Sequence, residues 1–216
     1  MAVHKPVQEG YYENISFWGW SQEYPEWNWT GYENKPLDVS VYTRYPVVRL
    51  YLNDKLLGEK TVSMKDNDRT KYTALFQVNY QAGELKAVGM ESGEEKESVI
   101  LRTAGAPAKI RLTPDRNPIT ASRNDLSYVR IELIDKEGQT VPDADCPVRL
   151  SVSGAGEISA SGNASPTDME SFRSLTPKTF HGKALAIVRP TGKDGIIVLK
   201  AVAEGLPEAS VEINVK

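Results

Sequence analysis

Cysteine and histidine are almost absent from this chain, which has one cysteine and two histidines among 216 residues. A single cysteine excludes an internal disulfide and a cysteine-based zinc site. Cys146 precedes an alternating apolar run, so we expect a small buried side chain at the start of a strand. Residues 66–68, Asp-Asn-Asp, begin like a calcium loop but lack its later glycine and acidic ligand. We therefore expect no metal and no cofactor.

Long apolar runs and a strong net charge are also missing. No apolar run approaches the roughly 18 residues that a membrane-spanning helix requires. The first ten residues lack the apolar segment of a secretion signal, as expected for a piece of a longer protein. The net charge of −3 creates no field that attracts nucleic acid or an anionic membrane. We expect neither as a partner.

Groups able to carry catalysis are equally scarce. His4 and His181 lie in different halves of the sequence, and no glycine-rich phosphate loop is present. Carboxylates are plentiful, but a glycosidase needs two of them about 5–10 Å apart across a cleft. Glutamates along the edges of strands do not provide that arrangement. The sequence therefore predicts no catalytic residue.

Strand patterns dominate what is present. Residues 36–42 and 47–52 alternate apolar and polar side chains, the period of a half-buried strand. Asn53 and Asp54 tolerate positive φ and predict a two-residue hairpin turn into residues 55–62. Residues 73–80 and 83–90 are expected to pair as a second hairpin. Further strands are expected at residues 97–103, 128–135, 148–156, 184–190, 195–205 and 209–215.

The chain divides near residues 104–109, where small residues and a proline without periodicity indicate a linker. Nine of the ten tyrosines precede residue 81, so the two halves differ in composition. We predict an all-β fold of two tandem immunoglobulin-like β-sandwiches, residues 1–104 and 105–216. Residues 162–182 form a long loop without strand pattern, and such loops often carry contacts.

An ordered series of motifs in the first half carries a family resemblance. The motifs are Trp27-Asn28-Trp29, Val41-Tyr42-Thr43, Leu50-Tyr51-Leu52-Asn53, Lys55 and Gly58. They resemble glycoside hydrolase family 2, the β-galactosidases of Bacteroides-type gut bacteria. Asp54 departs from the family pattern, which usually has glycine there. Residues 105–216 resemble the last immunoglobulin-like domain of that family.

The resemblance implies a non-catalytic role. The catalytic glutamates of the family lie on a (β/α)₈ barrel that precedes these modules, and such a barrel takes about 250 residues. The chain then resembles a C-terminal accessory region, whose partners are the barrel and N-terminal sandwiches of a parent glycosidase. The resemblance also implies the bacterial periplasm or cell exterior. Two alternatives are a carbohydrate-binding module for galactoside glycans and an adhesin-like tandem-sandwich interaction protein.

All four tryptophans lie within residues 17–29. Trp27 and Trp29 are two residues apart and close to the strand at residues 36–42, so we expect both to pack in the core. Trp18 and Trp20 belong to a lead-in that precedes the sandwich. We expect that pair at a surface facing another module or a sugar. Structural roles are expected for Trp27, Trp29, Asn53, Asp54 and Gly58.

Overall fold

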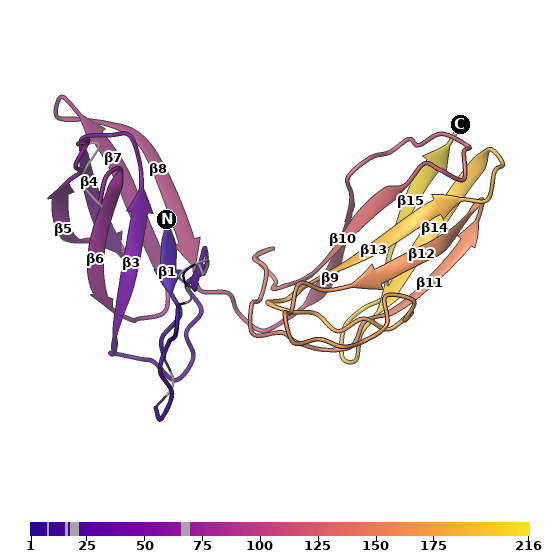
Figure 1. The fold of residues 1–216 in the computed structure, drawn as a ribbon, viewed down its shortest axis with the longest axis horizontal. Helices are drawn as coiled ribbons and strands as arrows, with labels where there is room; N and C mark the ends of the chain where they lie inside the picture. The colour runs from indigo at the N-terminus through magenta and orange to yellow at the C-terminus, as the bar shows by residue number, and fades with distance from the viewer. Residues whose placement is uncertain (8, 16, 18–21, 66–69) are drawn as a thin grey trace. The chain divides into compact units, whose positions relative to one another are not determined.

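The structure, a computed structural model, describes residues 1–7, 9–15, 17, 22–65 and 70–216. Strands are the only regular elements of these residues, and they form two compact units, Met1–Thr103 and Ala104–Lys216. Each unit is a pair of antiparallel sheets, so the predicted all-β fold of two β-sandwiches is confirmed (Figure 1). The described residues contain no helix of the length and apolarity that crossing a bilayer requires.

Unit 1 contains two four-stranded sheets, with strand orders β2-β1-β3-β6 and β5-β4-β7-β8. Side chains from both sheets meet in one core, in which Val39, Leu50 and Leu85 are fully buried. The strands are β1 (Ala2–His4), β2 (Glu23–Tyr24), β3 (Pro36–Tyr42), β4 (Val47–Leu52), β5 (Lys55–Thr61), β6 (Thr73–Asn79), β7 (Glu84–Glu91) and β8 (Glu94–Arg102).

The predicted hairpin of residues 73–80 with 83–90 is wrong. β6 pairs with β3, whereas β7 pairs with β4 and β8, so these consecutive strands belong to different sheets. The end of β6 is held beside the segment before β3, because Tyr80 N–H donates to the carbonyl of Lys35. The short connection therefore crosses between the sheets instead of folding back as a hairpin.

Unit 2 contains a sheet of order β12-β13-β10-β9 and a second of order β11-β14-β15. Its core includes the fully buried Ile131, Ile197 and Ile213. The strands are β9 (Lys109–Pro114), β10 (Ser127–Ile134), β11 (Arg149–Gly154), β12 (Gly156–Gly162), β13 (Lys183–Pro190), β14 (Gly195–Val202) and β15 (Ala209–Val215).

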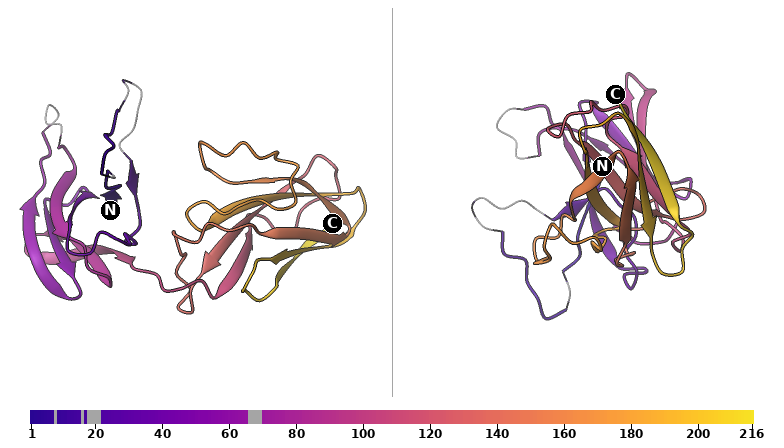
Figure 2. Two further views of the ribbon diagram at one scale, coloured as in Figure 1. Left: turned by 90° about the horizontal axis from the view of Figure 1, so that it is seen from below. Right: turned by 90° about the vertical axis from the view of Figure 1, so that its right-hand side faces the viewer.

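Two strands of unit 2, β9 and β12, were not predicted from the sequence. β12 is half-buried along most of its length and carries an irregularity between Ile158 and Ala160 where it pairs with β13. A bulge of this kind breaks the alternation on which strand prediction depends. Figure 2 shows the long loop that joins β12 to β13 lying outside the sheets of this unit.

Candidate functional site

Trp27 lies in the core of unit 1 and joins three segments. Its side chain is fully buried, and its indole N–H donates to the carbonyl of Gln81 at 2.9 Å. The ring meets Tyr80 edge-on, with centroids 5.0 Å apart. The Thr103 hydroxyl donates to the carbonyl of Trp27 at 2.6 Å and accepts from Gly83 N–H. Trp27 thus links the start of the sandwich to the last residue of the unit.

Trp29 is only 8% exposed and belongs to the same core. Its indole nitrogen is buried without a hydrogen-bond partner among the residues that the structure describes. Trp18 and Trp20, the pair expected to face a module or a sugar, lie outside the described residues, as do residues 66–68.

Asn53 and Asp54 form the two-residue turn between β4 and β5, with φ of 49° and 63°. The Asn53 side chain accepts from Glu84 N–H at 2.8 Å and donates to the carbonyl of Ala82 at 3.1 Å. Asn53 therefore fastens this turn to the connection before β7. Gly58 of β5 pairs with Leu50 of β4. A Cβ added at Gly58 would lie 4.0 Å from the Phe76 ring, which is ordinary van der Waals contact.

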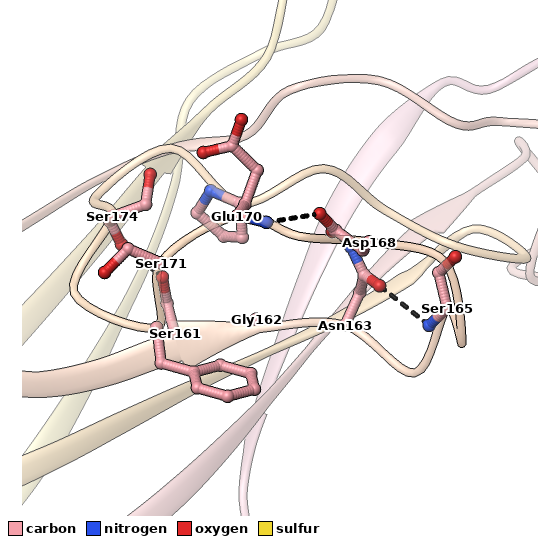
Figure 3. Close-up of a pocket in the computed structure, with 10 residues that line it drawn as sticks. Ser161, Gly162, Asn163, Ser165, Asp168, Glu170, Ser171 and Ser174 are labelled. Atoms are coloured by element: carbon pink, nitrogen blue, oxygen red, sulfur yellow. Dashed lines mark hydrogen bonds between the residues drawn. The ribbon is translucent and has the colours of Figure 1, made fainter.

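An open polar groove of about 440 Å³ lies on unit 2, beside the loop of residues 162–182. A smaller recess of about 50 Å³ adjoins it and is shown in Figure 3. The groove is lined by carboxylates, an amide, an ammonium group and an aromatic ring, including Asp145, Asn163, Asp168, Glu170, Lys178 and Phe180.

Asn163 organises this loop through both ends of its amide. Its Oδ1 accepts from Ser165 N–H at 2.8 Å (Figure 3). Its Nδ2 donates to the Asp168 carboxylate and to the carbonyl of Lys178. Asp168 also accepts from Glu170 N–H at 2.9 Å. The bonds from Glu170 and Asn163 lower the pKa of Asp168 below its usual 3.8, so this carboxyl is ionised at neutral pH.

Thr179 also lines the groove, and its hydroxyl accepts from Cys146 N–H at 2.9 Å and donates to the carbonyl of Ala144. Cys146 is partly buried against the core of unit 2. Burial raises the pKa of the Cys146 thiol, which disfavours the reactive thiolate. Cys146 is therefore a packing residue here.

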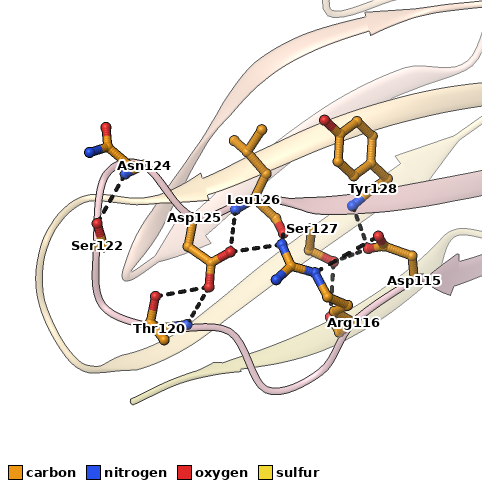
Figure 4. Close-up of polar contacts among 9 residues, drawn as sticks. All are labelled: Asp115, Arg116, Thr120, Ser122, Asn124, Asp125, Leu126, Ser127 and Tyr128. Carbon is orange, nitrogen blue, oxygen red and sulfur yellow. Dashed lines mark hydrogen bonds and ion pairs between the residues drawn. The ribbon is translucent and has the colours of Figure 1, made fainter.

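A second polar cluster supports the loop between β9 and β10 (Figure 4). The Asp125 carboxylate accepts from Thr120 N–H at 2.7 Å, from the Thr120 hydroxyl at 2.9 Å and from Arg116 at 2.7 Å. The bonds from Thr120 and Arg116 hold the pKa of Asp125 well below its usual range. Asp115 accepts from Tyr128 N–H at 2.7 Å. The hydrogen bonds of Asp115 and Asp125 stabilise the loop between β9 and β10.

Glu132 is a buried carboxylate with charged neighbours, and it is 5% exposed. It lies 3.0 Å from Arg111 and 3.2 Å from Arg130, and accepts from the Thr140 hydroxyl. Within the described ranges, no three histidine, cysteine, aspartate or glutamate side chains are grouped to hold a metal ion.

Comparison with known families assigns both units. Residues 110–212 match the model described as glycoside hydrolase family 2 C-terminal domain 5, and residues 34–97 match a domain of unknown function (DUF4982). A β-galactosidase of Bacteroides ovatus is 37% identical over 192 residues, which are 88% of this chain and 22% of that protein. A β-glucuronidase of Formosa agariphila is 26% identical over 170 residues, or 77% of this chain and 17% of that protein.

Solved structures agree with these matches. A glycosyl hydrolase family 2 member from Bacteroides cellulosilyticus aligns with all of this chain, at a TM-score of 0.90 and 36% identity. The alignment covers 28% of that protein, so the chain spans less than a third of the relatives it matches. The resemblance drawn from the sequence motifs is confirmed. The chain belongs to glycoside hydrolase family 2 and corresponds to a C-terminal region of the longer members of that family.

Proposed function

We propose that this chain is the non-catalytic accessory region of a β-galactosidase and acts in carbohydrate degradation as part of that enzyme. The observation that carries the proposal is the alignment of the whole chain with a family 2 structure at a TM-score of 0.90. A galactosidase parent is favoured over a glucuronidase parent because the Bacteroides ovatus β-galactosidase is 37% identical, against 26% for the Formosa β-glucuronidase.

The roles of the carboxylates support a non-catalytic chain. Glycoside hydrolysis needs an acid and a base or nucleophile that face each other across a substrate cleft. Asp125 and Glu132 are instead engaged by hydroxyl and guanidinium groups of their own sheet and loop. In the open groove, Asp168 is held by Asn163. These contacts stabilise the fold and leave the chemistry to another part of the parent enzyme.

The proposal is tested by comparing the purified 216-residue chain with the full-length parent on a chromogenic β-galactoside. We expect turnover by the parent and none by the chain alone. Turnover by the isolated chain that a single Glu→Gln change abolishes would overturn the non-catalytic role. A parent that cleaves glucuronides but not galactosides would overturn the substrate assignment.

The groove on unit 2 favours carbohydrate binding as a second candidate function. Its volume lies within the range of about 300–1,000 Å³ typical of small-ligand sites. Glu170 and Lys178 offer an acceptor and donors for sugar hydroxyls, and Phe180 offers an apolar face. An NMR titration with galactose and galacto-oligosaccharides tests this function. We expect shifts confined to residues 162–182, lost in Lys178→Ala and kept in Lys193→Ala, a control at an exposed turn.

A further inference from the structure

We propose that the described residues of the segment between β1 and β2, residues 5–7, 9–15, 17 and 22, are part of a docking arm that contacts the part of the parent enzyme preceding this chain. The proposal rests on the proposed function, since it requires a parent with further modules. It is carried by the described residues of the arm, which combine a fixed base with exposed apolar side chains.

The base of the arm is anchored in the core of unit 1. Val3 of β1 is fully buried and pairs with Val39 of β3 on one side and with Tyr24 of β2 on the other. Lys5 N–H donates to the carbonyl of Gln22 at 2.7 Å, which extends the ladder by one bond into the arm. The two ends of the arm are therefore held together as the stem of a hairpin.

Polar contacts add to this anchoring. His4 Nε2 lies 3.0 Å from the Glu13 carboxylate, which ties the arm back to its stem. Glu23 of β2 accepts from the Ser40 hydroxyl at 2.8 Å and from the Tyr42 hydroxyl, both on β3. The path of the arm is thus defined at its base, and Figure 2 shows the segment after β1 extending away from the sheets of unit 1.

Beyond this base the arm exposes large apolar side chains. The exposed fractions are 47% for Val7, 75% for Tyr11, 86% for Tyr12, 50% for Ile15 and 91% for Phe17. Single exposed apolar residues are normal on protein surfaces, but a run of them in one short segment marks an interaction site. Ordering such a segment costs conformational entropy, and the described side chains of the arm supply little apolar burial to offset that cost. A partner surface would supply it.

The remainder of the parent enzyme is the partner that fits best. The relatives are several times longer than this chain, which covers 22% and 28% of two of them and matches a C-terminal domain model. Most of such a parent precedes β1, and the arm starts directly after β1. Tyrosine and phenylalanine are enriched in the buried centres of protein interfaces, where charged residues are depleted. Glu13, one of the charges of the arm, is already paired with His4.

Hydroxyl-radical footprinting of the full-length parent and of the isolated 216-residue chain tests the proposal. We expect Tyr11, Tyr12 and Phe17 to be labelled several-fold less in the parent. Tyr42 and Leu75, 56% and 48% exposed on β3 and β6, are the references and should be labelled alike in both proteins. Equal labelling of the arm in both proteins would overturn the docking role. If added galactose protected the arm of the isolated chain from labelling, the arm would be a sugar-binding site instead of a docking site.

A variant provides a second measurement. Replacing Tyr11 and Tyr12 together by serine should lower the melting temperature of the full-length parent and leave that of the isolated chain unchanged. The control, Leu56→Ser with Leu75→Ser, replaces two side chains of 50% and 48% exposure elsewhere on unit 1. It should change the melting temperatures of the parent and of the isolated chain by the same amount. Equal effects of both variants on the parent would contradict docking. A wild-type parent without galactosidase activity would overturn the proposed function, whatever the footprint shows.

Discussion

The indole N–H of Trp27 donates a 2.9 Å hydrogen bond to the main-chain carbonyl of Gln81, 54 residues further along the chain. The neighbouring Trp29 is also buried, but its indole N–H has no hydrogen-bond partner among the described residues. Trp27 and Trp29 belong to the same core, but only the indole nitrogen of Trp27 contributes a hydrogen bond to its stability among the described residues.

Trp27→Phe should destabilise unit 1 more than Trp29→Phe. Both changes remove similar apolar volume, but the first also removes the hydrogen bond to the Gln81 carbonyl, which contributes about 0.5–1.5 kcal/mol. The second removes a buried donor that is already unsatisfied. Urea unfolding followed by fluorescence compares the two variants, and a larger loss for Trp29→Phe would contradict the assignment.

Trp29→Ala should nevertheless be severe. Truncating a buried tryptophan typically costs about 3–5 kcal/mol because it leaves a cavity in the core. That is a large share of the usual stability of about 5–15 kcal/mol. Circular dichroism melting should show unit 1 largely unfolded or strongly destabilised. A change of a few tenths of a kcal/mol would mean that Trp29 does not pack in the core.

Asp54→Gly should be neutral or stabilising, because glycine adopts the observed φ of 63° without strain. Asn53→Gly should destabilise, although φ at this position is also positive. It removes the side-chain bonds to Glu84 N–H and to the Ala82 carbonyl. Each bond contributes about 0.5–1.5 kcal/mol. Melting temperatures of the two variants should move apart, and equal shifts would contradict a role for the Asn53 side chain.

Unit 2 should lose stability in acid partly through Asp135. Burial opposes ionisation of this carboxyl, but bonds from the N–H groups of Gly105 at 2.9 Å and Gln139 at 2.8 Å outweigh it and lower the pKa of Asp135 below 3.8. A depressed folded-state pKa contributes stability that is complete above the unfolded pKa and lost as pH falls through the folded one.

Asp135→Asn should therefore be less stable than the wild type at pH 7 and show a smaller loss of stability between roughly pH 4 and the acid limit. Urea midpoints of unit 2 measured across that range provide the comparison. Glu208→Gln, on an exposed residue paired with Lys200, is the control and should follow the wild-type profile. Parallel pH profiles for Asp135→Asn and the wild type would show that ionisation of Asp135 does not contribute to the loss of stability in acid.

Asn163→Ala should loosen the loop of residues 162–182 without unfolding unit 2. The change removes the amide contacts to Asp168, Ser165 and the Lys178 carbonyl. Chymotrypsin should then cut faster at Phe172, which is 70% exposed, while the melting temperature stays nearly constant. Asn124→Ala, on an exposed loop residue, is the matched control. Unchanged cleavage would show that Asn163 does not organise the loop.

Some of these features follow from local sequence alone. Successive side chains of a strand point to opposite faces, so alternation within Pro36–Tyr42 predicted that Leu37, Val39 and Val41 share one buried face. The turn at Asn53 and Asp54 also follows from local sequence, because two residues that tolerate positive φ between apolar runs specify a hairpin. The family resemblance also depends only on the order of motifs along the chain.

Strand pairing and the groove were decided by the tertiary structure. β6 and β7 are both strands as expected, yet they belong to different sheets, because partners are chosen by which apolar faces can be buried together. The Trp27 bond to Gln81 joins residues 54 apart, and the Cys146 bond to Thr179 joins residues 33 apart. No local pattern encodes such contacts. They form only when distant segments are brought together, since burial leaves each polar group to find its partner inside the fold.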